Sequence, residues 1–280
     1  MRFAQRLALK YVRTKFKLLS SISKRKAAEK AFVLFCTPQH RNVKPLPPVF
    51  EKADVLSFPF EHYTVTGYRW NAASSKKVLI LHGFESSVVN FERFVKPLVD
   101  KGYQVLAFDA PAHGRSSGKT INVVTYKKLV EHIIREYGPI QSFISHSFGG
   151  LTLSLVLDEM PHGPDMKVVF IAPAVETTTA MENFFKLIKL DRDARHEFGN
   201  LITEIGGHPP SWYSVSRAAR KIRAQVLFLQ DSHDHMTPLR DVTPIMDMKL
   251  PNFRFVITEG LGHRRIYRDT ANVKTIIDFL

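Results

Sequence analysis

Short apolar runs alternate with helix-like patterns along most of the chain, from about residue 55 to residue 280. The apolar runs predict strands buried on both faces, at residues 78–81, 105–108, 140–145, 168–171, 225–230 and 253–257. Hydrophobic residues at helical spacing lie between them, at 91–101, 123–137 and 272–280. Residues 55–70 alternate apolar and polar positions, which predicts two antiparallel strands. This order predicts an α/β fold with a mostly parallel, doubly wound sheet.

One block, between residues 173 and 222, breaks the alternation because it contains no strand pattern. Phe184, Phe185, Phe198 and Leu201 recur there at helical spacing. Such a block predicts a small helical insertion at about residues 174–222, lying over the strand ends as a lid. In the alternative interpretation, its aromatic side chains form only the insertion's own core.

The first 50 residues differ from the rest and are expected to form a helical arm and a Pro-rich linker. Residues 2–22 carry an apolar stripe at helical spacing, made of Phe3, Leu7, Tyr11, Leu18 and Ile22. A second helix is predicted at 27–36, and four prolines between residues 38 and 48 predict an extended linker. Residues 51–280 are then the α/β domain.

Charge separates the two parts further. Residues 1–50 hold 12 Lys and Arg against one acid (+11), and residues 51–280 hold 28 against 25 (+3). A nucleic-acid-binding protein is not expected, because the domain itself is nearly balanced. Three interpretations of residues 1–26 stay open: a helix on an anionic membrane surface, a targeting presequence, or a solvated helix whose stripe packs on the domain.

The sequence constrains the cellular compartment of the protein only weakly. The single cysteine, Cys36, excludes an internal disulfide and permits a reducing compartment. No apolar run approaches the ~20 residues of a membrane-spanning helix. We expect a cytoplasmic protein, with peripheral attachment to a membrane as the alternative.

The segment 144–150 (ISHSFGG) holds the candidate nucleophile. A buried strand runs into it and a helix leads out, so Ser147 occupies a tight strand-to-helix turn. The free N–H groups and positive dipole end of that helix would face anything bound beside the hydroxyl. Small residues around a serine are also common in ordinary turns, so this motif alone does not decide the function.

Five landmarks in sequence order give the chain a family resemblance. They are His82-Gly83-Phe84, the stretch 109–116 (DAPAHGRS), the Ser147 turn, the stretch 231–238 (DSHDHMTP) and Gly262-His263. Over residues 55–280 the chain resembles serine hydrolases of the α/β-hydrolase fold, of the esterase and lipase type. One departure is Ser145, which stands where the motif G-x-S-x-G has its first glycine.

The resemblance implies a Ser-His-Asp triad with Ser147 as nucleophile, His263 as base and Asp234 as the acid that orients it. Asp234 is preferred because 231–238 matches the family pattern G-x-x-D-x-x-V/T-P, with Asp231 in the glycine position. Asp231 is the rival acid, and Glu176 is a more distant alternative.

The resemblance also places the oxyanion hole at the backbone N–H groups of Phe84 and Phe148. Next to them, His82, Gly83 and His146 are assigned to substrate binding, with structural or packing roles as the alternatives for the two histidines. The stretch 109–116 is expected to be scaffold. His233 and His235 flank Asp234, but their spacing within a loop is a poor zinc site, so neither a metal nor another cofactor is expected.

The implied function is hydrolysis of a small-molecule carboxylic ester through an acyl-enzyme. The aromatic residues of the insertion, with Phe84 and Phe148, indicate an apolar acyl group. A thioesterase, an amidase or a C–C bond hydrolase would use the same triad. A membrane-surface or partner-binding protein on a hydrolase scaffold is the alternative from another class, motivated by the basic arm and by Ser145.

Overall fold

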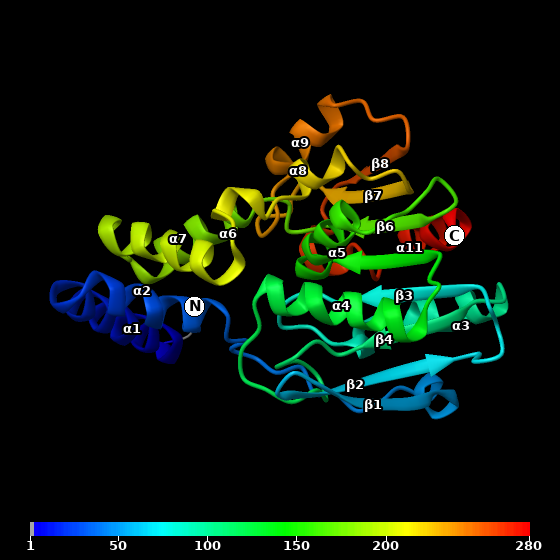
Figure 1. The fold of residues 1–280 in the computed structure, drawn as a ribbon, viewed down its shortest axis with the longest axis horizontal. Coiled ribbons are helices and arrows are strands. Elements are labelled where there is room, and N and C mark those ends of the chain that lie inside the picture. Colours follow the sequence, from blue (N-terminus) through cyan, green and yellow to red (C-terminus); the bar gives the residue numbers. More distant parts are fainter. Residues whose placement is uncertain (1–2) are drawn as a thin grey trace. The chain divides into compact units, whose positions relative to one another are not determined.

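An eight-stranded sheet lies at the centre of the unit formed by residues 38–175 and 214–280 (Figure 1). It is seen in a computed structural model that describes residues 3–280. The strands are β1 Asp54–Phe60, β2 Tyr63–Trp70, β3 Lys77–Leu81, β4 Gln104–Phe108, β5 Ser142–His146, β6 Lys167–Ile171, β7 Gln225–Asp231 and β8 Phe253–Thr258.

The strand order is β1-β2-β4-β3-β5-β6-β7-β8, and only the pairs β1–β2 and β2–β4 are antiparallel. The predicted α/β fold with a mostly parallel sheet is confirmed. From β3 the chain goes to β4 on one side and then returns to β5 on the other. The crevice at the carboxyl ends of β3 and β5 is therefore the switch point at which such sheets place their ligands.

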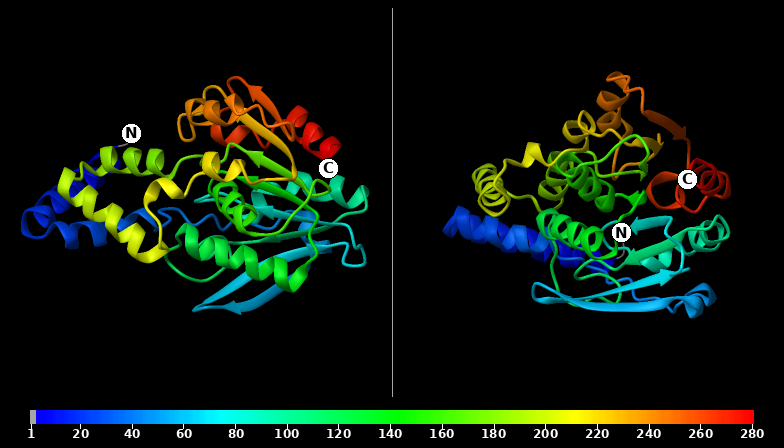
Figure 2. Two further views of the ribbon diagram at one scale, coloured as in Figure 1. Left: turned by 45° about the horizontal axis from the view of Figure 1, so that its top comes forward. Right: turned by 45° about the vertical axis from the view of Figure 1, so that its right-hand side comes forward.

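Helices cover both faces of this sheet (Figure 2). Helices α3 and α11 pack together on one face, and α4, α5 and α8 form the layer on the other. The helical segments of this unit are η1 Pro48–Lys52, η2 Val88–Phe91, α3 Glu92–Asp100, α4 Val123–Tyr137, α5 Phe148–Glu159, α8 Val215–Ala219, α9 Leu239–Asp247, α10 Gly262–Arg265 and α11 Thr270–Phe279.

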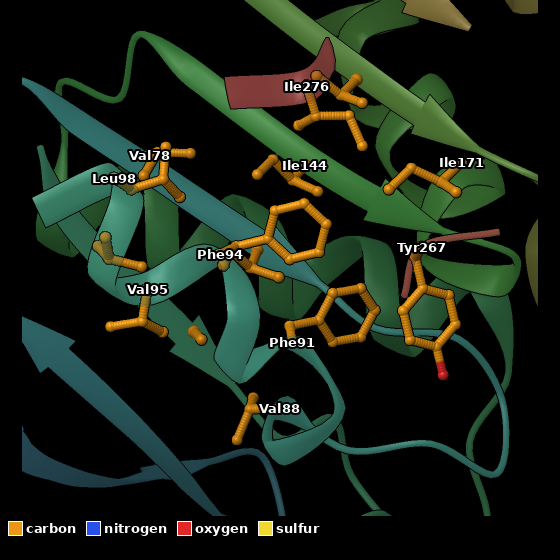
Figure 3. Close-up of a cluster of buried hydrophobic side chains, with 14 of the residues drawn as sticks. Val78, Val88, Phe91, Phe94, Val95, Leu98, Ile144, Ile171, Tyr267 and Ile276 are labelled. Atoms are coloured by element: carbon orange, nitrogen blue, oxygen red, sulfur yellow. The ribbon is translucent and has the colours of Figure 1, made fainter. Parts of the chain in front are cut away.

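The core on the α3 and α11 side joins residues from distant parts of the chain. Figure 3 shows Val78, Ile144 and Ile171 of the sheet together with Phe94 of α3 and Ile276 of α11. All five are buried, which anchors the sheet to this helical layer. After a first lysine, strands β3 and β6 are continuous apolar runs because they are covered on both faces. Strand β5 is equally buried but carries Ser142, Ser145 and His146.

Residues up to Thr37 and residues 176–213 form a second compact unit. Its helical segments are α1 Phe3–Ile22, α2 Lys24–Phe35, α6 Thr177–Ile188, α7 Arg192–Gly206 and η3 Pro210–Trp212. From their sequence, these two segments are predicted to be separate parts, an arm and an insertion. The structure joins them because their aromatic side chains pack together.

Phe198 of α7 is the centre of that aromatic core. Its ring centroid lies 5.6 Å from Phe32 and 5.7 Å from Phe35, both of α2, and 5.0 Å from Phe185 of α6. Phe184 lies 5.1 Å from Phe35. These aromatics therefore form the unit's own core and give no support to an apolar acyl group. The role of this segment as a lid stays a prediction.

The apolar stripe of α1 is exposed. Leu7, Tyr11, Leu18 and Ile22 are 60%, 69%, 61% and 79% exposed, whereas Phe16 and Ser20 of this helix are buried. Within its own unit the stripe is thus left outside the core, and its packing on the α/β domain stays a prediction. Residues 1–2, the start of the predicted helix, lie outside the described residues. Within residues 3–280, no helix combines the length and apolar character required to cross a bilayer.

Candidate active site

Ser147 sits in a strained turn between β5 and α5, with φ 54° and ψ −118°. A non-glycine residue adopts such a backbone only when its surroundings impose it. Its N–H donates to the carbonyl oxygen of Ile171 at 3.1 Å. A Cβ atom on Gly149 would lie 2.7 Å from the carbonyl oxygens of Leu81 and His82. Gly149, two residues after the serine, is therefore required for α5 to start close to β3.

His263 connects the serine to a carboxylate. Its Nε2 lies 2.9 Å from the Ser147 hydroxyl, and its Nδ1 lies 2.7 Å from Asp234 Oδ2. With Nδ1–H donating to the carboxylate, Nε2 is left to accept the serine proton. The three residues implied by the resemblance are thus brought together, although they come from three segments of the chain.

Asp234 is buried and held by its own loop. Its Oδ1 accepts hydrogen bonds from the N–H groups of Met236 at 2.8 Å and Thr237 at 3.0 Å. The Thr237 hydroxyl donates to Oδ2 at 2.7 Å. Burial raises the pKa of Asp234, but the hydrogen bonds from His263 and Thr237 outweigh it and bring the pKa below its ordinary value. The carboxylate is therefore ionised at neutral pH.

Asp231, the rival acid, bonds elsewhere. Its Oδ2 accepts from the Thr258 hydroxyl at 2.8 Å and from the Leu261 N–H at 2.9 Å, and its Oδ1 accepts from the His233 N–H at 3.0 Å. It therefore fixes the loop that leads into α10, the short helix that carries His263, and does not contact the imidazole. This role was not predicted from the sequence, although an aspartate at the end of a strand before a loop is a usable signal.

The loop after β3 supplies the second candidate oxyanion donor. Within residues 3–280, the N–H groups of Phe84 and Phe148 donate to no acceptor of the protein. A Cβ atom on Gly83 would lie 2.8 Å from Cβ of Ser147 and 3.0 Å from Nδ1 of His146. The loop thus passes the nucleophile so closely that only glycine fits, and unused donors are what an oxyanion hole requires.

His82 supports this loop from beneath. Its Nδ1–H donates to the Gly83 carbonyl at 2.8 Å, and its Nε2 accepts from the Ala110 N–H at 2.9 Å. Burial lowers its pKa to about 4, with partial compensation from the Gly83 hydrogen bond. Both ring nitrogens of His82 are thus occupied by backbone groups, which fits the structural alternative, and its substrate contact stays a prediction.

His146 holds the segment that carries His263. It is buried, and its Nε2–H donates to the backbone carbonyl of His263 at 2.9 Å. Burial and the neighbouring His263 lower its pKa to about 3. It therefore positions the segment that carries the base. Its buried Nδ1 has no hydrogen-bond partner among the described residues, and its expected substrate contact stays a prediction.

The stretch 109–116 completes the support. His113 Nε2 accepts from the Glu85 N–H at 2.9 Å, and Asp109 Oδ1 accepts from the Val88 N–H at 2.9 Å. Both side chains are buried, so they fix the loop that carries Phe84. Among residues 3–280, no group of three or more His, Cys, Asp or Glu side chains is arranged to hold a metal ion.

Comparison with known families identifies this arrangement. The model of the family described as "Serine aminopeptidase, S33" matches residues 72–224, more than half of the chain. The chain belongs to this family. It is a hydrolase of the α/β-hydrolase fold, and the resemblance to serine hydrolases of this fold is confirmed.

Individual relatives agree with the family. The uncharacterized hydrolase YugF of Bacillus subtilis is 29% identical over 111 residues, which span only 38% of each chain. The structure of the Pyrococcus furiosus esterase Pf2001 aligns with a TM-score of 0.65 and 21% identity, covering 87% of this chain and 95% of the esterase. A membrane phospholipase A, a bacterial virulence factor, aligns with a TM-score of 0.61 and 15% identity over 98% and 97% of the two chains. At these identities, the two structures show a shared fold.

Proposed function

We propose that this hydrolase cleaves carboxylic esters with Ser147 as nucleophile, His263 as base and Asp234 as the orienting acid. The observation that carries the proposal is the continuous relay from carboxylate to imidazole to hydroxyl, with distances of 2.7 Å and 2.9 Å. A serine hydroxyl needs an adjacent base to become nucleophilic near neutral pH, and the base needs a fixed tautomer.

In the proposed reaction, the Ser147 oxygen attacks the ester carbonyl while His263 Nε2 takes its proton. The N–H groups of Phe84 and Phe148 then stabilise the negative oxygen of the tetrahedral intermediate. The alcohol leaves with the proton from His263, and the acyl group remains on Ser147. Water, activated by the same imidazole, attacks the acyl-enzyme and releases the acid.

An ester substrate is favoured by the similarity to the Pyrococcus furiosus esterase. The rings of Phe84 and Phe148 pack edge to face at 5.9 Å beside the nucleophile, which supports an apolar acyl group. The same relay would serve a thioester, an amide or a C–C bond, so a substrate panel distinguishes these alternatives.

The test combines a fluorophosphonate probe with p-nitrophenyl esters of increasing chain length. We expect labelling of the native chain at Ser147 and a loss of several orders of magnitude in kcat for Ser147→Ala. Ser145→Ala, at the neighbouring serine whose hydroxyl bonds to the Val169 carbonyl, should keep both labelling and turnover. Absence of labelling at Ser147 in folded protein would refute the proposal.

A further inference from the structure

The exposed stripe of α1 is continuous and narrow. At 3.6 residues per turn, positions 7, 11, 18 and 22 fall within an arc of about 60° of the helix surface. Leu7, Leu18 and Ile22 are each at least 60% exposed, and Tyr11 is 69% exposed. Phe16, on the opposite side, is buried. One face of α1 thus packs inside its own unit, and the other presents a row of large apolar side chains to solvent.

Basic residues border this stripe on both sides, and no acid occurs in α1. Lys15 lies about 20° beyond one edge, and Lys10 and Lys17 lie about 60–80° beyond the other. These three lysines are exposed, and within residues 3–280 none of them forms an ion pair. By contrast, Arg25 of α2 is paired with Glu29 and Glu204. The charge along α1 is therefore not compensated.

A cavity of about 510 Å³ opens beside the Lys10 and Lys17 edge. Its lining includes four basic side chains, Arg13, Lys17, Lys24 and Lys189, and one carboxylate, Asp191. That carboxylate is bonded to Lys24 at 3.1 Å and accepts the Ala194 N–H at the start of α7. The lining keeps a net positive charge, which suits a phosphate group.

We propose that α1 docks on an anionic phospholipid surface. The apolar stripe enters the boundary between head groups and acyl chains, the lysines on its two edges contact lipid phosphates, and the basic cavity receives one head group. Apolar side chains in a narrow row with cations on both edges and no acid match this surface. The inference goes beyond the proposed ester hydrolysis and does not depend on it.

Sedimentation with vesicles tests this docking. The Ser147→Ala variant of the 280-residue chain, chosen so that lipid is not cleaved, is mixed with vesicles of phosphatidylglycerol and phosphatidylcholine in equal parts, or of phosphatidylcholine alone. We expect binding to the anionic vesicles that weakens with added salt. Replacing Lys10, Lys15 and Lys17 by Gln should lower the partition coefficient on the order of 100-fold. Replacing Leu7, Leu18 and Ile22 by Gln should lower it by at least about tenfold.

Two control variants remove the same number of lysines or of apolar side chains at exposed positions outside α1. One replaces the exposed Lys52, Lys119 and Lys249 by Gln, and the other replaces the exposed Val43, Leu46 and Val55 by Gln. Both should bind as the parent does. The proposal is overturned if the parent fails to bind anionic vesicles, or if either α1 variant binds as well as its control. A dimer in solution that the stripe variant dissociates would also overturn it, because a second copy would then cover the stripe.

The vesicle test and the fluorophosphonate test are independent, so each can refute its own proposal without the other. Fluorophosphonate labelling of the native chain is measured without lipid, and sedimentation uses a chain without the nucleophile. Labelling without vesicle binding would support the ester hydrolase and refute the docking of α1 on lipid. Vesicle binding without labelling would refute the ester hydrolase and support the docking.

Discussion

Ser145 and Gly83 both lie near the nucleophile, but only the position of Ser145 has room for a side chain. Ser145 replaces the first glycine of the G-x-S-x-G pattern, yet its buried hydroxyl donates to the Val169 carbonyl at 3.0 Å. The side chain is accepted because β6 supplies an acceptor for it. At Gly83, even a Cβ atom would meet Ser147 at 2.8 Å. The departure from the motif therefore carries no argument against catalysis.

Gly83→Ala should displace the loop that carries the Phe84 N–H. We expect kcat/KM for a p-nitrophenyl ester to fall on the order of 100-fold, as for loss of one oxyanion donor. Gly163→Ala is the control, because nothing lies within 4 Å of its added Cβ atom. Unchanged kinetics of Gly83→Ala would show that the loop does not position a catalytic donor.

The two aspartates of the stretch 231–238 are separable by kinetics. Asp234→Asn should lower kcat on the order of 10⁴-fold, because the amide favours the wrong tautomer of His263. Asp231→Asn removes an acceptor from the loop only, so its effect on kcat should be far smaller and its main effect a lower free energy of unfolding. Urea unfolding of both variants, read beside kcat, checks this. Equal kinetic losses would make Asp231 a partner in catalysis.

At the scale of elements, the placement of α10 and of the loop before it decides whether the base reaches the nucleophile. Asp231 holds the loop through the Leu261 N–H, and His146 holds α10 through the His263 carbonyl. Both contacts come from other strands.

The predicted helix at 123–137 coincides with α4, whose start is fixed locally because Asn122 accepts the Thr125 N–H at 2.9 Å. Helix α9 was missed, since Pro244 interrupts its pattern.

His146→Phe keeps a ring at this position but removes the N–H that donates to the His263 carbonyl. We expect kcat to fall on the order of tenfold to 100-fold, because a base displaced by a fraction of an ångström transfers the proton poorly. His146→Gln can still donate and should recover most of the lost activity. If both variants lose activity equally, His146 acts through packing alone.

At the scale of the whole molecule, buried neutral histidines couple the fold to pH. Burial lowers the pKa of His82 to about 4 and the pKa values of His113 and His146 to about 3. Above the unfolded value of about 6.5, both states are neutral and these groups contribute nothing to the pH dependence. As the pH falls below about 6.5, the unfolded chain takes up protons that the folded chain cannot, so stability is lost. Asp109, whose pKa burial raises, offsets part of this loss.

His146→Gln should therefore reduce the pH dependence of stability. Between pH 7.5 and pH 5.5, the loss of unfolding free energy should be smaller than in the parent by about 1.4 kcal/mol, the value for one group with an unfolded pKa near 6.5. Urea unfolding at the two pH values measures it. His40→Gln is the control, because it removes an exposed histidine. An unchanged difference would mean that His146 is protonated in the folded chain.

The sequence by itself determined the strands, most of the helices, the turn at Ser147 and the concentration of positive charge before residue 50. These features depend on residues close together in the chain: the period of apolar positions, a cap or a small residue in a turn. Only the tertiary structure decided that Asp234 and not Asp231 meets His263, that His82 supports a loop and that His146 holds α10. It alone decided that residues up to 37 pack with 176–213, and which face of α1 is exposed. Each of these depends on which distant segments meet, and local pattern carries no information about that.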